Sequence, residues 1–296
     1  MRLATFIYQE QEQIGAVTVK GSATQLIPIR QFGRFPGTMQ ELIEAGPTTW
    51  QELETALQQE ALGLIPLAAV DLLAPIPRPR KNVMCLGLNY ADHAAETRAT
   101  LPEHLVVFTK SPTAVNSPYG DIPYDPAVSE KLDWEVELGV IIGRSGRQIA
   151  PENAMDHVFG YTVVDDISAR DIQRQHKQYF LGKSLDGACP LGPWIVTAGD
   201  IADPHALTLR TRVNGVLKQE GTTADLVFDI PQAIAILSRG MTLEPGDIIA
   251  TGTPAGVGFA RTPPEFLQPG DVVECEVDRI GTIRNRVVNL KNEGTN

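Results

Sequence analysis

Residues 133–143, with the sequence DWEVELGVIIG, constrain the fold of this chain more than any other segment. Their content of Val, Ile, Leu and Trp predicts a β-strand, in which alternate side chains point to the same face. Glu135 and Glu137 therefore emerge together from an otherwise apolar strand, with Cα atoms about 7 Å apart. Two carboxylates that close and partly buried repel each other and lose hydration, and a divalent cation would offset both costs. The alternative is a solvated strand face on which the two glutamates have no special role.

The charge balance of the chain excludes some classes of function. The 296 residues include 25 Lys and Arg against 36 Asp and Glu, which gives a formal net charge of -11. This balance opposes binding to nucleic acid or to an anionic membrane surface through general electrostatics. A small acidic substrate is still compatible with it, provided that local cations or a metal attract that substrate.

The cysteines and the apolar segments indicate the cellular compartment. Cys85, Cys189 and Cys275 are far apart and form no CxxC pair, which argues against a disulfide framework or a zinc site. The N-terminus has no basic region followed by a long apolar run, and prolines and an aspartate interrupt the most apolar segment, residues 62–76. We therefore expect a cytoplasmic protein with reduced thiols, no signal peptide and no transmembrane helix.

A proline-rich segment, APIPRPRKN at residues 74–82, divides the chain, because consecutive X-Pro units force an extended backbone that suits a linker. Two strand patterns and two short helical patterns precede it, at residues 3–8, 14–19, 38–45 and 49–59. We predict a small N-terminal α+β domain at residues 1–75 and a catalytic domain at residues 76–296. In the second domain, short strands with turn signals about every 8 to 12 residues predict a mainly β body within an overall α+β fold.

A polar pair follows the linker. Residues 84–96, MCLGLNYADHAAE, begin as an apolar strand and continue as a helix on which His93 and Glu96 share a face. The carboxylate would then orient the imidazole and increase its basicity, which outlines a general-base pair. Surface helices also produce this spacing by chance, so the pair alone does not define a site.

Two aspartates form another acidic feature, within GYTVVDDISARDIQ at residues 160–173. The strand pattern ends just before Asp165 and Asp166, a position that suits a metal ligand but also suits a simple turn. Ser168 and Asp171 match the spacing of a capping box and predict a helix that starts there.

A metal site built from these acids would have a restricted chemistry. If Glu135, Glu137 and one of the two aspartates share an ion, the all-oxygen donor set selects Mg2+ or Mn2+, is compatible with Ca2+, and disfavours zinc. About three octahedral positions would stay open for water or substrate. Such a site can chelate a 2-oxo acid through its carboxylate and keto oxygens.

Five motifs in this order resemble the fumarylacetoacetate hydrolase family: MCLGLNYADHAAE, LDWEVELGVIIG, GYTVVDDISARDIQ, GKSLDGACPLGPWIVT and GDIIATGTPAGVG. The resemblance covers about residues 80–290, and the N-terminal segment resembles the small leading domain of longer bacterial members. The stretches HKQYFLGKSLDGACPLGP and RTPPEFL look most similar to the bacterial oxaloacetate decarboxylase and acylpyruvate hydrolase members and to their mitochondrial relatives.

The resemblance assigns roles to individual residues. It implies that the metal ligands are Glu135, Glu137 and Asp166, that the catalytic residues are His93, Glu96 and Lys183, and that the substrate-binding residues are Gln173 and Thr253. Without it, Lys183 and Gln173 would be read as ordinary surface residues. For Arg170 a structural ion pair and a substrate contact are equally compatible. The resemblance also implies a β-roll core and a homodimer.

The predicted function is divalent-metal-dependent cleavage of a C–C bond in short 2-oxo acids, with a pyruvate enolate as the leaving group. In acylpyruvate hydrolysis His93 would activate water and Lys183 would stabilise the oxyanion. Oxaloacetate decarboxylation, or tautomerisation of a 2-oxo acid, at the same site is the alternative. A binding protein that keeps the metal without turnover is an alternative of another class, against which the intact pair His93 and Glu96 argues.

Overall fold

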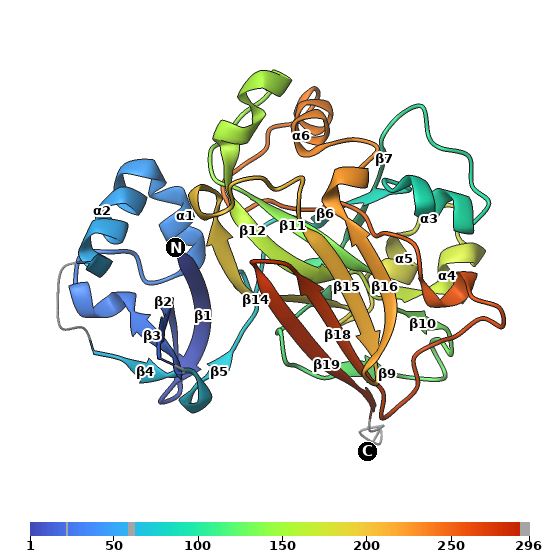
Figure 1. Cartoon of the computed structure of the whole chain (residues 1–296), viewed down its shortest axis with the longest axis horizontal. Coiled ribbons are helices and arrows are strands. Elements are labelled where there is room, and N and C mark those ends of the chain that lie inside the picture. Colours follow the sequence, from blue (N-terminus) through green and yellow to red (C-terminus); the bar gives the residue numbers. More distant parts are fainter. Residues whose placement is uncertain (22, 59–62, 291–296) are drawn as a thin grey trace, which may run out of the picture.

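The computed structural model describes residues 1–21, 23–58 and 63–290, and Figure 1 shows a small N-terminal lobe beside a larger body. The mainly β architecture that the sequence predicts is confirmed. In the described part of the chain, none of the helices is long and apolar enough to traverse a lipid bilayer.

The N-terminal lobe is an antiparallel meander with two helices. Its strands are β1 (Arg2–Tyr8), β2 (Gln11–Lys20), β3 (Ala23–Pro28), β4 (Ile65–Pro66) and β5 (Asp71–Leu72), and its helices are α1 (Met39–Glu44) and α2 (Gly46–Gln58). The helix α1 starts where expected because Thr38 and Glu41 form a capping box. The predicted strands and helices are therefore confirmed, except that Gln59, the last residue of the second helical pattern, lies outside the described residues.

The sheet is continuous across the predicted boundary between the domains. β1 pairs antiparallel with β14 (Cys189–Thr197), and the strand order is β4-β3-β2-β1-β14-β12-β11-β17-β6-β7. The remaining strands of this path are β12 (Val158–Asp165), β11 (Val136–Ile142), β17 (Ile248–Ala250), β6 (Val83–Gly87) and β7 (Val106–Lys110). The division at residue 75 stays a prediction, and the N-terminal strands extend the sheet of the larger body.

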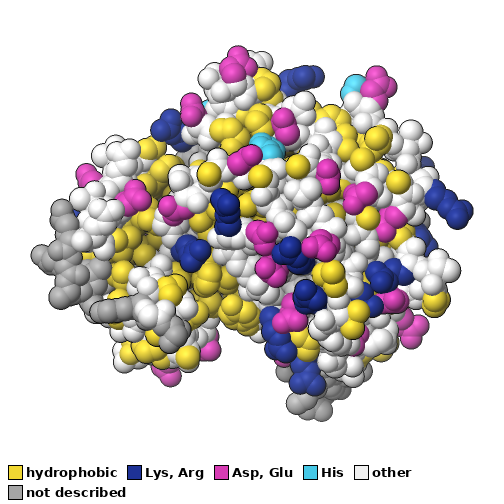
Figure 2. All heavy atoms as spheres, in the orientation of Figure 1, with side chains coloured by type: hydrophobic (Ala, Val, Ile, Leu, Met, Phe, Trp, Pro, Cys, Tyr) yellow, Lys and Arg dark blue, Asp and Glu magenta, His cyan; other side chains and the backbone are white. Residues whose placement is uncertain are grey.

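A second sheet covers one face of the first. Its order is β16-β15-β18-β19-β9, with β16 (Val216–Thr222), β15 (Thr208–Val213), β18 (Val272–Val277), β19 (Gly281–Asn289) and β9 (Ile122–Tyr124). Alternate residues of β15 and β18 are buried against β11 and β12, which form one apolar core with them. The outward residues include Arg210, Arg212, Glu274 and Glu276, and Figure 2 shows both signs over this sheet, where Arg210 pairs with Glu220 and Asp278.

Short helices gather at the end of the body away from the N-terminal lobe (Figure 1). They are α3 (Ala91–Glu96), α4 (Arg170–Gln175) and α5 (Phe180–Lys183), whereas α6 (Ile230–Ser238) lies elsewhere on the body. The predicted capping box at the start of α4 is wrong. Ser168 belongs to the short strand β13 (Ser168–Ala169), which pairs with β10 (Leu132–Asp133), and its hydroxyl donates to the backbone carbonyl of Asp166. Asp171 instead accepts a hydrogen bond from Ser129.

Candidate active site

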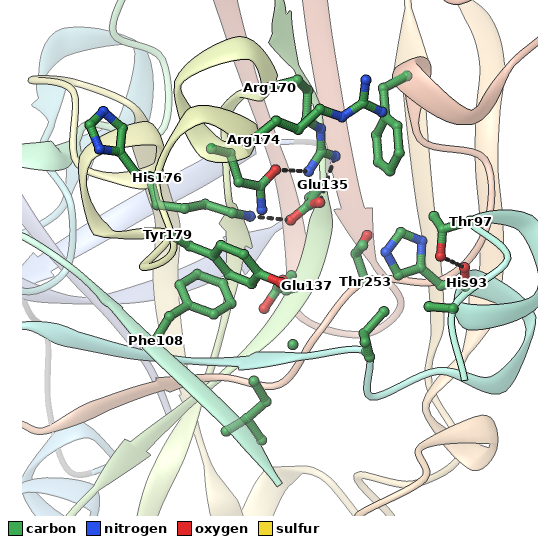
Figure 3. A pocket seen from close by; sticks show the side chains of 17 residues that line it. His93, Thr97, Phe108, Glu135, Glu137, Arg170, Arg174, His176, Tyr179 and Thr253 are labelled. Carbon is green, nitrogen blue, oxygen red and sulfur yellow. Dashed lines mark hydrogen bonds and ion pairs between the residues drawn. The ribbon is translucent and has the colours of Figure 1, made fainter. Parts of the chain in front are cut away.

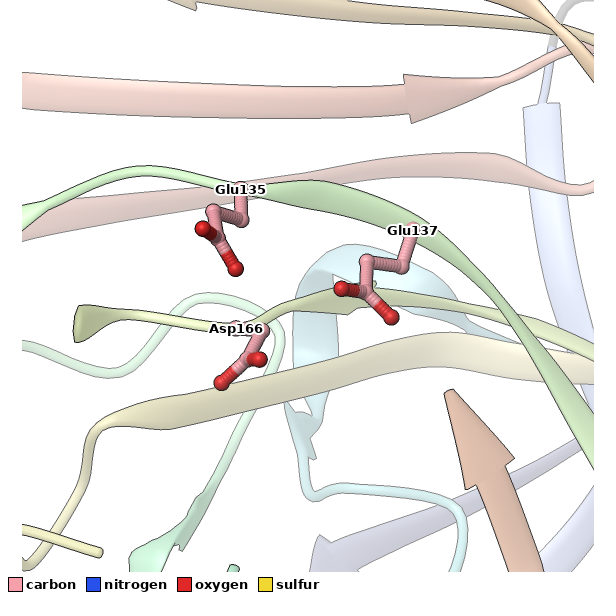
Figure 4. Close-up of side chains that lie close together, drawn as sticks. All are labelled: Glu135, Glu137 and Asp166. Carbon is pink, nitrogen blue, oxygen red and sulfur yellow. The ribbon is translucent and has the colours of Figure 1, made fainter. Parts of the chain in front are cut away.

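Three carboxylates converge where β11 begins and β12 ends. Glu135 directly precedes β11, Glu137 lies within it, and Asp166 directly follows β12. Because Val136 pairs with Asp165 in the antiparallel ladder, the ends of the two strands lie side by side. Ligand oxygens of the three acids lie within 4.8 Å of one another, and Figure 4 shows the three side chains grouped together.

The structure separates the two neighbouring aspartates. Asp165 points away from the cluster, and its Oδ1 accepts a hydrogen bond from the backbone N–H of Glu135 at 3.0 Å. Successive residues at the end of a strand face opposite sides, so Asp166 alone of the pair joins the two glutamates. Burial raises the pKa of Asp165 to about 7. The choice of Asp166 as a metal ligand stays a prediction. The structure is compatible with it, because Asp166 lies beside the two glutamates and Asp165 does not.

Buried cations surround two of the three acids. The Lys183 ammonium lies 2.6 Å from Glu135 Oε2 and 2.6 Å from Asp166 Oδ2. Lys110 donates to the other oxygen of Asp166 at 2.6 Å, and Arg170 donates to Glu135 Oε1 at 2.6 Å. Burial opposes the charged form of Glu135, but Lys183 and Arg170 together lower its pKa below the usual value. These pairs hold the carboxylates in fixed orientations.

Among the described residues, Glu137 is the acid of the cluster without a cationic partner. Its Oε2 accepts a hydrogen bond from the backbone N–H of Gly252 at 2.8 Å. Burial, followed by the charges of Asp166 and Glu135, raises the pKa of Glu137 well above its usual range. A divalent cation bound by all three carboxylates would remove this repulsion, and the all-oxygen donor set suits Mg2+ or Mn2+. The residues therefore fit a hard divalent cation.

Arg170 connects the acidic cluster to a glycine-containing loop. Its Nε donates to Asp133 Oδ2 at 2.8 Å, and Asp133 also accepts hydrogen bonds from the backbone N–H groups of Gly258 and Phe259. Of the two roles that the sequence left open for Arg170, the structural ion pair is present. The guanidinium also lines the cavity beside the cluster.

His93 and Glu96 form a hydrogen-bonded pair at the cavity wall. His93 Nδ1 lies 2.9 Å from Glu96 Oε1, and Glu96 Oε2 accepts the backbone N–H of Gly256 at 2.9 Å. A carboxylate can only accept, so Nδ1 carries the proton and Nε2 is left as the basic nitrogen. Since His93 lines the same cavity as Glu135 and Glu137, the structure brings the predicted base to the predicted metal site.

The cavity has a volume of about 370 Å3 and contains the two residues that were predicted to bind substrate. Arg170, labelled in Figure 3, donates from Nη1 to Gln173 Oε1 at 3.0 Å. Among the described residues the NH2 group of Gln173 has no acceptor, so it can donate to a ligand. Thr253 Oγ1 accepts from Gln219 Nε2 at 2.8 Å, so its own hydroxyl proton is available to another acceptor. Both side chains can therefore donate hydrogen bonds to an oxygen-rich ligand.

Sequence reasoning missed three buried polar residues of this site. Asp133 had a signal, because strand alternation places it on the same face as Glu135 and Glu137. Lys110 ends an apolar strand and gave no comparable signal. Gln219 stabilises the site from the second sheet, since its Oε1 accepts from the backbone N–H of Val136. Nothing in its local sequence indicates this contact, which joins residues 83 positions apart.

The fold and the site together define the class of this molecule. It is a mainly β protein with a buried cluster of three carboxylates beside a cavity. Residues 82–288 match the family described as Fumarylacetoacetate (FAA) hydrolase C-terminal, and the chain belongs to the fumarylacetoacetate hydrolase family. The matched range agrees with the extent of the resemblance in the sequence. The family assignment is thus confirmed.

Curated relatives cover most of the chain. The oxaloacetate tautomerase YisK of Bacillus subtilis is 54% identical over 224 residues, which are 75% of this chain and 74% of that protein. A mitochondrial oxaloacetate tautomerase of Rattus norvegicus is 43% identical over 290 residues, which are 97% of this chain and 92% of the relative. Both names contain oxaloacetate and tautomerisation, which belong to the predicted alternative rather than to the predicted hydrolysis.

Solved structures have the same fold over nearly the whole chain. A fumarylacetoacetate hydrolase from Exiguobacterium antarcticum superposes with a TM-score of 0.84 at 38% identity, covering 98% of this chain and 100% of its own. A maleylpyruvate hydrolase from a Sphingobium species, in complex with manganese (II) ion and pyruvate, gives 0.80 at 33% identity with the same coverage. The shared fold and the sequence similarity to these relatives therefore make the chain an enzyme of this family.

Proposed function

We propose that this chain catalyses the metal-dependent keto–enol tautomerisation of oxaloacetate or a closely similar 2-oxo acid. The observation that carries the proposal is the position of His93, oriented by Glu96, in the same cavity as Glu135 and Glu137. Tautomerisation needs a base near an acidified C–H bond and a site that stabilises an enolate oxygen, and it needs no water. The names of the relatives from Bacillus subtilis and Rattus norvegicus support this choice over hydrolysis.

The metal would be held by Glu135, Glu137 and Asp166. When bound there, a divalent cation would polarise the 2-oxo group and stabilise the negative charge that develops on its oxygen. The predicted ions are Mg2+ or Mn2+, with Ca2+ as a third candidate because it takes the same oxygen ligands. The neighbour from Sphingobium, described with manganese and pyruvate, supports an ion of this kind next to a 2-oxo acid.

His93 would transfer the proton. Its Nε2 removes a proton from C3 of the substrate, the C2–C3 double bond forms, and the carbonyl electron pair moves to the C2 oxygen. The proton then returns to that oxygen, which gives the enol, and the reverse sequence regenerates the keto form. Glu96 accepts the hydrogen bond from the Nδ1–H group throughout, and thereby stabilises the imidazolium and keeps Nε2 directed into the cavity.

Three further side chains would bind substrate oxygens. Lys183 uses two of its three N–H donors on Glu135 and Asp166, which leaves one for an oxygen in the cavity that it lines. Thr253 and Gln173 each have a donor available, as described above. These neutral and cationic donors would orient a carboxylate or stabilise an enolate oxygen without moving during the reaction.

Hydrolysis of a C–C bond in an acylpyruvate is the second candidate at the same site. The structural similarity to a maleylpyruvate hydrolase favours it. In that reaction His93 would deprotonate a water that attacks the C4 carbonyl, and a pyruvate enolate would leave. Decarboxylation of oxaloacetate would produce the same enolate with loss of CO2.

One parallel assay separates these reactions. Oxaloacetate enriched in its enol form is mixed with enzyme and Mg2+ or Mn2+, and loss of the enol absorbance is recorded together with pyruvate release; acetylpyruvate is treated in the same way. Tautomerisation is supported by rapid loss of enol without pyruvate, dependent on metal and on His93. Pyruvate formed as fast as the enol disappears would instead establish decarboxylation or hydrolysis. No metal-dependent change in any substrate would favour a non-catalytic binding protein.

We also propose that the chain works as a homodimer in the cytoplasm, as the family resemblance and the three buried free cysteines suggest. Sedimentation of the purified protein would test the first point, since a monomer at micromolar concentration contradicts it. Fractionation of the producing cells would test the second.

A further inference from the structure

Arg174 occupies a distinctive position at the cavity. It lies one helical turn after Arg170 on α4, so the two side chains share a helix face. Both guanidinium groups stand over the ring of Phe259, with Cζ at 4.3 Å from the ring centroid for Arg170 and at 5.1 Å for Arg174. Phe259 thereby supports Arg174 at the cavity wall, where Figure 3 shows the arginine among the lining side chains.

The charge of Arg174 is not compensated within the part of the chain that the structure describes. Arg170 is paired with Asp133 and Glu135, and Lys183 with Glu135 and Asp166. Arg174 lines the same cavity, is exposed to solvent, and forms no ion pair with a carboxylate of the described residues. It therefore offers the cavity a planar set of donors and a full positive charge.

We propose that Arg174 determines specificity for dicarboxylic 2-oxo acids by binding the carboxylate that is distant from the 2-oxo group. The inference rests on the proposed function, which directs the 2-oxo carboxylate toward the cluster of Glu135, Glu137 and Asp166. The second carboxylate of a four-carbon acid then points away from the cluster, toward the part of the cavity wall that Arg174 lines one helical turn beyond Arg170.

The chemistry of the ligand follows from this arrangement. A guanidinium can bind a carboxylate through two parallel hydrogen bonds, an arrangement that an ester or a methyl ketone cannot reproduce. An anionic substrate entering a protein of net charge -11 also requires local positive charge, and Arg174 supplies it at the cavity wall. Acetylpyruvate has no distal carboxylate, so its turnover would not depend on this contact.

The test compares oxaloacetate with its C4 monoethyl ester, which differs by a single charge. Steady-state constants and, by calorimetry with Mn2+ present, dissociation constants are measured for the unmodified protein, Arg174→Gln and Arg174→Lys. The ratio of kcat/KM for oxaloacetate to that for the monoester should fall by about tenfold in Arg174→Gln, mostly through KM. In Arg174→Lys this ratio should fall less, because lysine keeps the positive charge but lacks the planar set of donors of a guanidinium.

Lys177→Gln is the matched control. It removes the same charge three residues away, and Lys177 is exposed and does not line the cavity. The ratio of kcat/KM values for oxaloacetate and the monoester should be the same in Lys177→Gln as in the unmodified protein. If the ratio falls as much as in Arg174→Gln, the effect is one of general electrostatics and the proposal is overturned.

The remaining outcomes separate this inference from the proposed function. If the unmodified protein tautomerises oxaloacetate but Arg174→Gln leaves the ratio unchanged, the role of Arg174 is refuted and the proposed function stands. If oxaloacetate binds more tightly than the monoester without turnover and Arg174→Gln abolishes the difference, the role of Arg174 is supported and tautomerisation fails. If oxaloacetate neither binds nor reacts, both proposals are overturned.

Discussion

The floor and the rim of the cavity are built in different ways. The floor consists of Glu135, Glu137 and Asp166 at the paired ends of β11 and β12, and every residue of both strands is buried. The rim consists of the short helices α3 and α4, which present His93 and Arg174. Strand ladders and buried ion pairs fix the floor, whereas α3 is attached by single hydrogen bonds that Asp92 and Glu96 accept from the backbone N–H groups of Ala255 and Gly256. Under the proposed function, the floor would hold the metal and the rim would provide proton transfer and selectivity.

The largest effect is expected from substitutions in the floor. Glu137→Gln and Asp166→Asn should each abolish metal binding and reduce activity by about a thousandfold, equivalent to about 4 kcal/mol. Their effects on the metal-free protein should be opposite. Glu137→Gln removes one of three repelling carboxylates and should raise the free energy of unfolding by about 1 kcal/mol. Asp166→Asn leaves Lys110 without a carboxylate partner and should lower it by about 3 kcal/mol.

Calorimetric titration with Mn2+ and denaturant unfolding in the presence of a chelator measure these two quantities. Equal destabilisation by both substitutions would contradict the distinction between a paired and an unpaired acid. If both variants still bind metal, the metal site does not lie in the floor.

Next in size is Lys110→Met, which tests whether ion pairs fix the floor. Lys110 is fully buried, and its ammonium donates to Asp166 and to the backbone carbonyl of Ile167. Removing one partner of a buried pair should lower the free energy of unfolding by about 3 kcal/mol. Lys177→Met, at an exposed position, is the control and should change it by less than about 0.5 kcal/mol. Similar urea midpoints for both variants would be inconsistent with this role of Lys110.

In the rim, His93→Ala should separate catalysis from metal binding. Loss of the base should reduce tautomerisation by about a hundredfold, while the affinity for Mn2+ stays within about twofold of the unmodified protein. The reason is that His93 lies on α3 and contributes no ligand atom to the acidic cluster. Full activity of this variant would refute the general-base role, and loss of metal affinity would show that floor and rim are not independent.

The smallest of these effects is expected from Glu96→Gln, a reduction of activity by about tenfold. The carboxylate accepts from His93 Nδ1 with Oε1 and from the backbone N–H of Gly256 with Oε2, and glutamine would place an NH2 group, a donor, at one of these two positions. One of the two hydrogen bonds must be lost. Loss of the bond to His93 would release the imidazole, and loss of the bond to Gly256 would loosen α3. Measuring kcat and KM for oxaloacetate checks the value, and an unchanged kcat would exclude both functions of Glu96.

The sequence predicted the floor better than the rim. Alternation along residues 133–143 placed Glu135 and Glu137 on one face, because a strand has a fixed period of two. The helical spacing of His93 and Glu96 likewise predicted a contact that the structure contains. The capping box at Ser168 was wrong because a strand pairing with Leu132 and Asp133 took precedence over a local preference. Arg174 gave no signal, since its position depends on the ring of Phe259, 85 residues later.

The sequence by itself determined the mainly β character, the two glutamates of the floor, the His93 and Glu96 pair, and the family. These follow from local periodicity and from motifs that are short and contiguous. The choice of Asp166 over Asp165 and the role of Lys183 came from the family resemblance, because the local pattern left both open. Only the tertiary structure decided that Lys110 and Gln219 support the site and that the N-terminal strands continue the central sheet. Such contacts join residues far apart in the chain, and a strand pattern does not specify which strand will lie beside it.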